Sequence, residues 1–464
     1  MGEILRENRI TYRYILGITY PIILSMFSMN LMVFVDRAFV AQYDLIEFAA
    51  SVPAGNAATA VANLFIGMIA FVSTLISQYY GAKEYDRCSS SMWQGIYLSL
   101  IFSVMLLLLS PWMSQLFELM GHSGELLHYE KRFFHLIIIS SCIQLLGNAV
   151  SGLYRGVGDT KMIMISAIAG NICNIVLDWL LIFGKFGFPE MGGIHGAGTA
   201  TILSCLLSLL IYLAMLFRPK YKNQFSSLKN FKPQQETIFK IVRYGFPAGV
   251  QAFVQTGYFS LLLLIIGGIG EVSLSAANIV FTIEGLSIFP VLGLGTAIGI
   301  IAAQERGARR TDLVPLVLRK GIMLGIVFSA FIILLFNILP VTLISIFQGD
   351  TNVEMFEQIK KMAIPLVRLT SIWIAFDTIH IIISNILKSM GDTYFIMVIY
   401  LAMPILFYIV LPYWICVVQG KSLQWVWWDL LLYTFLMLAL VAVRFKSNKW
   451  RGINIIEERK LEMQ

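Results

Sequence analysis

Residues 153–183 read LYRGVGDTKMIMISAIAGNICNIVLDWLLIF, and this stretch decides the fold class. A Gly-Asp-Thr turn sequence (158–160) is followed by an apolar run that we place at 162–184. A run of about 20 apolar residues is long enough to cross a hydrocarbon core of about 30 Å. Because a lone apolar segment satisfies its backbone hydrogen bonds in lipid only as a helix, the stretch predicts a membrane-spanning helix.

Similar runs recur along the whole chain of 464 residues, of which 58% are apolar and only 13% are charged. A soluble domain carries roughly 25% charged residues, and the sequence lacks the short segments of alternating polarity that are typical of a membrane β-barrel. We therefore predict an all-α integral membrane protein with twelve transmembrane helices. We place these helices at 14–40, 47–77, 91–118, 132–154, 162–184, 196–217, 238–267, 272–304, 316–346, 363–387, 394–417 and 423–444.

The distribution of Lys and Arg predicts the orientation of the chain in the membrane. Of the 34 Lys and Arg residues, six lie in the odd-numbered loops and two lie in or at the edge of spans. The other 26 lie in the N-terminus, the even-numbered loops and the C-terminal tail. Since cytoplasmic loops carry an excess of Lys and Arg, we expect both termini in the cytoplasm. This topology explains the net charge of +7 without a nucleic-acid partner.

The second half of the chain repeats the first half. A shift of 233 residues pairs the Gly-Asp-Thr turn at 158–160 with a second one at 391–393, and a shift of 226 residues pairs several earlier positions. The difference of seven residues fits one lengthened loop between the two blocks. The shift covers six helices, so both halves enter the membrane in the same direction, as in a parallel repeat. The pairs at 226 are Pro21 with Pro247, Gly67 with Gly293, Gln78 with Gln304, Gly81 with Gly307, and Gly95 with Gly321.

The repeat predicts two pseudo-symmetric six-helix bundles and a division of the chain into four parts. These are an N-terminal lobe (1–218), a polar cytoplasmic linker (219–236), a C-terminal lobe (237–446) and a cytoplasmic tail (447–464). Two such bundles are a common architecture of carriers that work by alternating access. Trp425, Trp427 and Trp428 open the last predicted span and are typical of an interfacial aromatic belt.

Carboxylates inside the predicted spans mark candidate functional residues. A charged side chain at the centre of a spanning helix costs roughly 2.5–3.5 kcal/mol on insertion scales, so it should face a cavity or a partner. At about 1.5 Å of rise per residue, Asp36 lies about 33 Å from the cytoplasmic start of the first span. Asp178 is about 16 residues into the fifth span. Both are therefore expected in the outer half of the membrane.

The fifth span adds amides on the same helix face as Asp178, because Asn171 and Asn174 precede it at i, i+3, i+7 spacing. With Thr201 of the sixth span at a comparable depth, Asp36, Asn174 and Asp178 could form one site. Such oxygen ligands suit a hard cation such as Na⁺, and close carboxylates could equally share a proton. The alternative is that the amides only join helix to helix and that Asp36 pairs with its neighbour. We expect that neighbour, Arg37, to point outward instead, since adjacent helical residues point about 100° apart.

In the second half, Gln255, Glu284 and Asp377 lie within predicted spans. They could line a substrate cavity or form a second proton site, with Arg368 or His380 as a partner. No Walker motif is visible in the sequence, and the glycine-rich segment 293–299 lies inside an apolar helix with no strand before it, so it indicates helix packing rather than a nucleotide loop.

Taken together, these residues resemble the multidrug and toxic compound extrusion (MATE) family over essentially the whole chain. The features that carry the resemblance are ordered along the sequence: Pro21 with Asp36 fifteen residues later, LYRGVGDT (153–160), Asn174 with Asp178, GAGTAT (196–201), GFP (245–247) and KSMGDT (388–393). The resemblance implies a pair of six-helix bundles that exports cationic, amphipathic compounds in exchange for Na⁺ or H⁺.

The resemblance also implies roles for particular residues. Asp36, Asn174, Asp178 and Thr201 match the cation site of the N-terminal lobe, Pro21 matches the proline at which the first helix bends, and Asp377 matches a C-terminal carboxylate that serves coupling in part of the family. The chain departs from the family at two positions. Gln255 stands where many members carry Glu, and Arg37 stands where a small residue is usual.

We therefore expect a secondary active antiporter for amphipathic, cationic organic compounds, coupled to H⁺ or Na⁺. A flippase for lipid-linked precursors and an intramembrane enzyme are the alternatives, and the sequence shows no nucleophile–base or metal constellation for the latter. The expected partners are a small organic substrate and the lipid bilayer. We expect a monomer in a bacterial inner membrane, with no resident cofactor.

Overall fold

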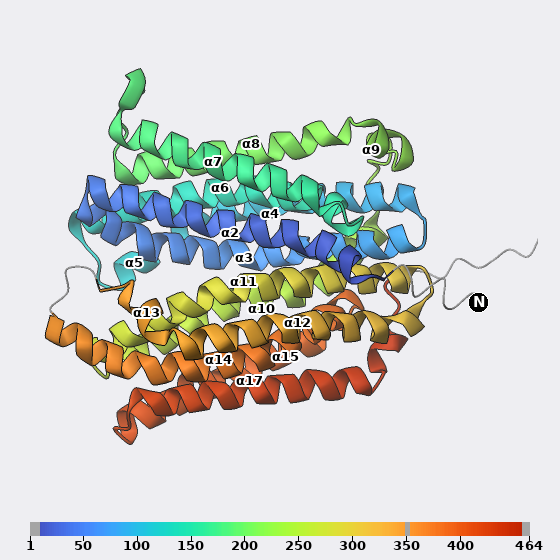
Figure 1. Cartoon of the computed structure of the whole chain (residues 1–464). Helices are drawn as coiled ribbons and strands as arrows, with labels where there is room; N and C mark the ends of the chain where they lie inside the picture. Colours follow the sequence, from blue (N-terminus) through green and yellow to red (C-terminus); the bar gives the residue numbers. More distant parts are fainter. Residues whose placement is uncertain (1–9, 349–352, 457–464) are drawn as a thin grey trace, which may run out of the picture. The chain divides into compact units, whose positions relative to one another are not determined.

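The computed structural model describes residues 10–348 and 353–456, and every regular element in these ranges is helical. Twelve of the described helical segments are long and apolar enough to cross a membrane, as predicted (Figure 1). Their helices are α2 (Tyr12–Tyr43), α3 (Leu45–Gly81), α4 (Tyr85–Met113), α6 (Gly124–Gly156), α7 (Thr160–Phe183), α8 (Gly193–Leu216), α10 (Gln235–Gly267), α11 (Glu271–Gly307), α12 (Val314–Ile338), α14 (Val353–Ser389), α15 (Thr393–Pro404) and α17 (Leu423–Lys446).

The remaining helical pieces are short. The span that begins with α15 continues to Val418 through two π-helical segments, η3 (Ile405–Val410) and η4 (Trp414–Val418), on either side of α16 (Leu411–Tyr413). The others are α5 (Leu116–Leu119), η1 (Lys185–Gly187), α9 (Pro219–Gln224), η2 (Thr311–Leu313), α13 (Pro340–Ser345) and η5 (Lys449–Gly452).

Six predicted helix ends are wrong by more than a turn, and three of these by more than two turns. The fourth span was expected to begin at 132, but α6 begins at Gly124. The ninth span was expected to run to 346, but α12 ends at Ile338 because Pro340, at the start of α13, cannot donate a backbone hydrogen bond to continue the helix. The tenth span was expected to begin at 363, but α14 begins at Val353. Its first ten residues are rich in charge, so the helix extends beyond the apolar stretch from which we had placed it.

The helix bounds reproduce both shifts of the repeat. α3 and α11 each have 37 residues and are related by 226 positions, while the ends of α6 and α14 and the starts of α7 and α15 are related by 233. α14 has 37 residues against 33 in α6, so four of the seven extra residues form about one more helical turn rather than a longer loop.

The chain divides into two compact units, and their boundaries do not coincide with the linker. The N-terminal unit comprises Tyr20–Phe253, Ala303–Arg309 and the described residues from Ile455 onward. The C-terminal unit comprises the described residues up to Thr19, Val254–Ala302 and Arg310–Asn454. Three helices, α2, α10 and α11, therefore contribute residues to both units.

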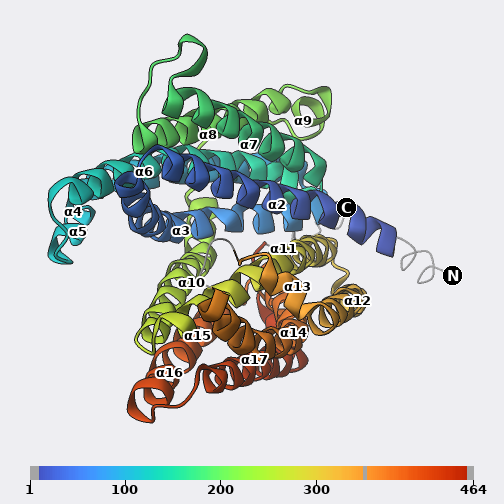
Figure 2. The same cartoon turned by 60° about the vertical axis from the view of Figure 1, so that its left-hand side comes forward.

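Each unit is organised around the fourth helix of its repeat. In the N-terminal unit α6 packs against α3, α4 and α8, and α7 lies beside α8 in both views (Figures 1 and 2). In the C-terminal unit α14 packs against α12 and α17, which are the repeat equivalents of α4 and α8. The same helix neighbours in both units are the packing signature of the internal repeat.

Glycine allows one very close helix contact within the N-terminal unit. A Cβ atom built on Gly81, at the end of α3, would lie 1.9 Å from the carbonyl oxygen of Gln304, near the end of α11. The reciprocal Cβ atom on Gly307 would lie 1.8 Å from the carbonyl oxygen of Gln78. Each glycine is thus pressed against the glutamine of the other repeat, which explains why both pairs appear at the same shift of 226.

The two Gly-Asp-Thr turns make equivalent contacts in the two units. Gly158 and Gly391 have φ of +83° and +92°, a region that favours glycine. The aspartate that follows each one binds a basic residue beyond the sixth helix or at its end. Asp392 accepts two hydrogen bonds from Arg444, from Nε (2.6 Å) and Nη2 (2.9 Å).

In the first repeat, Asp159 accepts hydrogen bonds from Lys220 Nζ (2.7 Å) and Tyr221 Oη (2.6 Å). Burial by itself would raise the pKa of the Asp159 carboxyl. The two hydrogen bonds, together with the positive charges of Lys220 and Arg218, overcome this effect and hold the pKa of Asp159 below its ordinary value.

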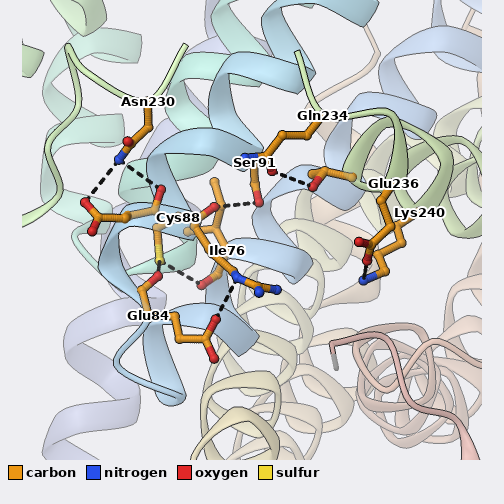
Figure 3. A network of polar contacts seen from close by, with 11 residues as sticks. Ile76, Glu84, Cys88, Ser91, Asn230, Gln234, Glu236 and Lys240 are labelled. Atoms are coloured by element: carbon orange, nitrogen blue, oxygen red, sulfur yellow. Dashed lines mark hydrogen bonds and ion pairs between the residues drawn. The ribbon is translucent and has the colours of Figure 1, made fainter. Parts of the chain in front are cut away.

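The linker between α8 and α10 is bound along one face of α4. Trp93 Nε1 donates to the Ser227 carbonyl (2.8 Å), and the Gln94 side chain bonds to the linker at Lys232 and Gln234. Figure 3 shows Asn230 and Gln234 of the linker in this polar network. The residues of α4 that hold the linker recur at helical spacing and are Asp86, Ser89, Trp93, Gln94 and Tyr97.

Candidate functional site

The structure brings three of the four predicted N-terminal site residues into contact. Asn174 and Asp178 of α7 are completely buried. With its amide oriented to satisfy both partners, Asn174 donates to Asp178 Oδ2 (3.2 Å) and accepts from the backbone N–H of Thr201 (3.2 Å) in α8. The hydroxyl of Thr201 donates to the Ala197 carbonyl (2.9 Å) of its own helix, so its lone pairs stay available to a ligand.

Asp36 of α2 is a near neighbour of Asp178, within range of electrostatic interaction. One carboxylate oxygen of each, Oδ1, is buried without a hydrogen-bond partner. Arg37 is exposed and forms no ion pair with Asp36 in the described part of the chain, although the two charged groups lie within range of electrostatic interaction. Two neighbouring carboxylates therefore each present a buried oxygen that lacks a hydrogen-bond donor.

A third polar contact fixes α2 against α7. Asn171 Nδ2 donates to Ser28 Oγ (2.7 Å), about one helical turn before Asn174. This is the helix-joining role that the sequence offered as the alternative for the amides. Asn171 joins α7 to α2, and Asn174 joins α7 to α8 while it also contacts Asp178. Pro21 lies inside α2, which is continuous from Tyr12 to Tyr43, and its role as a bend stays a prediction.

A partly open cavity of about 200 Å³ lies beside this group and is lined by residues of α2, α6, α7 and α8. Asn171 and Thr201 belong both to the polar group and to the cavity wall. Met29 and Met32 give the cavity an apolar side, and Arg155 lies at the C-terminal end of α6. The sequence offered no signal for Arg155, because a single Arg in a turn motif is not distinguished from the other basic residues at helix ends.

In the C-terminal unit the structure brings together Glu284 and Asp377, but not Gln255. Glu284 Oε1 accepts a hydrogen bond from Trp373 Nε1 (3.1 Å), and Asp377 follows Trp373 by one helical turn on α14. The two carboxylates lie within range of electrostatic interaction. Gln255 is exposed, and no hydrogen bond joins it to either carboxylate in the described ranges.

His380 is the partner of Asp377, as one of our two alternatives proposed. Its Nδ1 lies 3.1 Å from Asp377 Oδ1, and its Nε2 lies 3.3 Å from Tyr400 Oη of α15. The other alternative, Arg368, is exposed. Tyr400 was missed, because a lone Tyr in an apolar helix carries no spacing signal.

Trp427 corrects the predicted aromatic belt. Its ring is fully buried, and its Nε1 donates to Thr370 Oγ1 (3.0 Å). Trp425 and Trp428, two positions before and one position after Trp427, point in other directions from the helix and are half exposed, which is compatible with the belt.

Twelve spanning helices in two repeated bundles, each with carboxylates held inside the helix packing, define a membrane transporter of the two-bundle kind. The family model MatE matches residues 21–180 and 247–414, one stretch in each repeat. The chain therefore belongs to the MATE family of multidrug efflux transporters, and it is a multi-pass membrane transporter rather than an enzyme.

Individual proteins agree with this assignment. The chain is 30% identical over 323 residues to the probable multidrug resistance protein NorM of Thermotoga maritima, over 68% of this chain and 67% of that protein. Among solved structures, a MOP-superfamily transporter from Pyrococcus furiosus, whose binding pocket is described as of reverse polarity, superimposes with a TM-score of 0.84 at 20% identity. The match covers 95% of this chain and 96% of that one. An outward-facing multidrug resistance MATE transporter gives a TM-score of 0.82 at 20% identity, covering 94% of this chain and 96% of that one.

Proposed function

We propose that this transporter exports amphipathic, positively charged organic compounds in exchange for H⁺ or Na⁺ by alternating access. Membership of a multidrug efflux family and relatives named for multidrug resistance support export of organic compounds. The carboxylates of both units favour a substrate with a positive charge, as the resemblance of the sequence implied.

The observation that carries the coupling proposal is the pair Asp36 and Asp178. Each has a buried carboxylate oxygen with no hydrogen-bond donor, and the side chain of Asp178 has no exposed surface at all. Burying an ionised carboxylate without a partner is costly. A proton shared between the two, or a Na⁺ bound by their oxygens with Asn174 and Thr201, would supply the missing partner.

The driving force is sufficient for export. One positive charge entering down a potential of about 100 mV releases about 2.3 kcal/mol before any concentration difference is counted. Maintaining a tenfold gradient of substrate requires about 1.4 kcal/mol. One ion per cycle would therefore sustain more than tenfold export, with the ion loaded at Asp36 and Asp178 from outside and released inside.

The group formed by Glu284, Asp377 and His380 is a second candidate for ion or substrate binding.

The positive charges of the even-numbered loops favour a topology with both termini in the cytoplasm, and a bacterial inner membrane is the setting we propose. The protein acts as a monomer, without a resident cofactor, and the transported ion is the only coupling partner.

The test is export of a fluorescent cationic dye from proteoliposomes in which a Na⁺ gradient and a proton gradient are imposed separately. We expect one of the two gradients to drive export, and we expect Asp36→Asn and Asp178→Asn each to lower the rate at least tenfold. Asp312→Asn removes an exposed carboxylate and is the matched control. If both site variants export the dye at the wild-type rate, the coupling site lies elsewhere, with Glu284 and Asp377 next in line.

A further inference from the structure

Arg155 is a cation inside the cavity of the N-terminal unit. It lies in the last turn of α6, is partly buried and lines the 200 Å³ cavity. The other lining residues come from α2, α6, α7 and α8, and none of them is Asp, Glu, Lys or His. In the part of the chain that the structure describes, Arg155 thus gives this cavity its charge, and that charge is positive.

The guanidinium of Arg155 lies within range of electrostatic interaction with Tyr212, another residue of the cavity wall, but it has no acidic partner among the described residues. The described residues provide it with no ion pair and no side-chain hydrogen bond, although a guanidinium carries five N–H donors. Asp159, one helical turn further along the chain, is the acid nearest in sequence, but Lys220 and Tyr221 occupy its carboxylate. The dipole at the C-terminus of α6 also favours a cation at this position.

The rest of the wall suits the body of an amphipathic molecule. Gln144, Asn148 and Asn171 present amides, while Met29 and Met32 present flexible thioethers that adapt to different apolar shapes. At about 30 Å³ of liquid volume per water molecule, the cavity corresponds to roughly seven waters. Pockets for whole drug-sized ligands measure about 300–1,000 Å³. The cavity therefore holds one end of such a ligand.

We propose that Arg155 binds an oxyanion, a carboxylate or a sulfonate, on one end of the exported compound. A guanidinium is suited to this task because its planar fork matches both oxygens of such a group. Asn171 and Thr201 join the cavity to Asp36 and Asp178, so a positively charged group on the same compound lies on the side of the carboxylates. The preferred substrate then carries an oxyanion in addition to the positive charge that the proposed function assigns to it. This inference deepens the proposed function and rests on it.

The test compares two compounds that differ only in the oxyanion: a fluorescent aromatic amine that carries a carboxylate, and its methyl ester. Binding is measured by fluorescence anisotropy with the full chain in nanodiscs of phosphatidylcholine. We expect the wild type to bind the zwitterion at least tenfold more tightly than the ester. Arg155→Gln is expected to abolish this preference without weakening ester binding, and Arg155→Lys to retain part of it, because the charge remains and the fork is lost.

Lys161→Gln is the matched control. Lys161 is an exposed cation at the start of α7 and is not part of the cavity wall, so this variant should keep the full preference. If Arg155→Gln binds the ester normally and still prefers the zwitterion tenfold, the proposal is overturned. Unchanged ester binding also shows that the variant is folded, and Arg155→Lys provides a second reading should Arg155→Gln fail to fold.

A lipid headgroup phosphate is the other source of an oxyanion, and nanodiscs with phosphatidylglycerol distinguish it. If phosphatidylglycerol displaces the zwitterion from the wild type but not from the Arg155→Gln variant, and proteoliposomes show lipid flipping, a lipid replaces the organic zwitterion as substrate and our assignment is refuted. Failure of the proposed function looks different: neither compound is exported under either gradient, while the Arg155-dependent preference in binding persists.

Discussion

The contact between the ends of α3 and α11 allows a sharp test of the helix packing through Gly307→Ala. A Cβ atom at this position would lie 1.8 Å from the carbonyl oxygen of Gln78, which belongs to a helix backbone and cannot rotate away. Forcing extra volume into a packed interior typically costs about 1–3 kcal/mol. Replacing a helical glycine by alanine gains about 0.5–1 kcal/mol where there is room.

The stabilisation gained when alanine replaces a helical glycine can be measured in the same helix, because a Cβ atom on Gly285 of α11 would meet nothing within 4 Å. We therefore expect Gly285→Ala to be neutral or slightly stabilising and Gly307→Ala to be destabilising. The difference between the two variants should be about 1–3 kcal/mol, since the gain in helix propensity largely cancels. Thermal unfolding of the purified protein in detergent, followed by tryptophan fluorescence, measures it.

The double variant Gly81→Ala with Gly307→Ala adds a further check. Both alanines disturb one contact, so the second should cost less than it does alone, whereas independent sites would add. If Gly307→Ala unfolds at the same temperature as Gly285→Ala, the close approach of the two helices in the structure is wrong.

Two further predictions concern the Gly-Asp-Thr turn and the linker of the N-terminal unit. Because the pKa of Asp159 is lowered in the folded protein, its carboxylate stabilises the fold above the ordinary aspartate pKa of about 3.9 and loses this effect as the pH falls through the lowered value. Asp159→Asn should therefore cost about 1 kcal/mol at about pH 7, after allowance for solvent screening. Its unfolding temperature should begin to converge with that of the wild type as the pH falls below about 4. A constant difference between the two proteins as the pH falls would contradict the linkage. Trp93→Phe removes the hydrogen bond to Ser227, which is worth about 1 kcal/mol. Trypsin should therefore cut the linker at Lys229 faster in this variant than in the wild type or in the control Trp112→Phe, which replaces an exposed indole. Equal cleavage of all three proteins would show that α4 does not hold the linker in this way.

Much of the fold follows from the sequence because apolar runs and repeated glycines are local signals. The twelve spans and the two shifts of the repeat are read from such signals, and the structure shows both. Helix ends are less certain where a charged segment continues a helix into water, as at the start of α14, since the membrane determines the apolar stretch but not the helix.

The candidate site is only partly visible in the sequence. Asn174 and Asp178 lie on one helix and their spacing places them on one face, so their contact is predictable. The pairing of Glu284 with Asp377 depends on how α11 packs on α14, and helix packing is a tertiary property that has no signature in spacing. The position of Arg155 in the cavity wall likewise depends on helix packing and could not be predicted from the sequence.

The exchange of helix segments between the two units bears on the origin of the chain. The first residues of α2, from the first repeat, belong to the C-terminal unit, and the first residues of α10, from the second repeat, belong to the N-terminal unit. Between two separate copies of a single repeat, a reciprocal exchange of this kind would be a domain swap. An ancestral six-helix protein with this arrangement would have exchanged these segments between two copies, and fusion of two gene copies would have preserved the exchange within one chain.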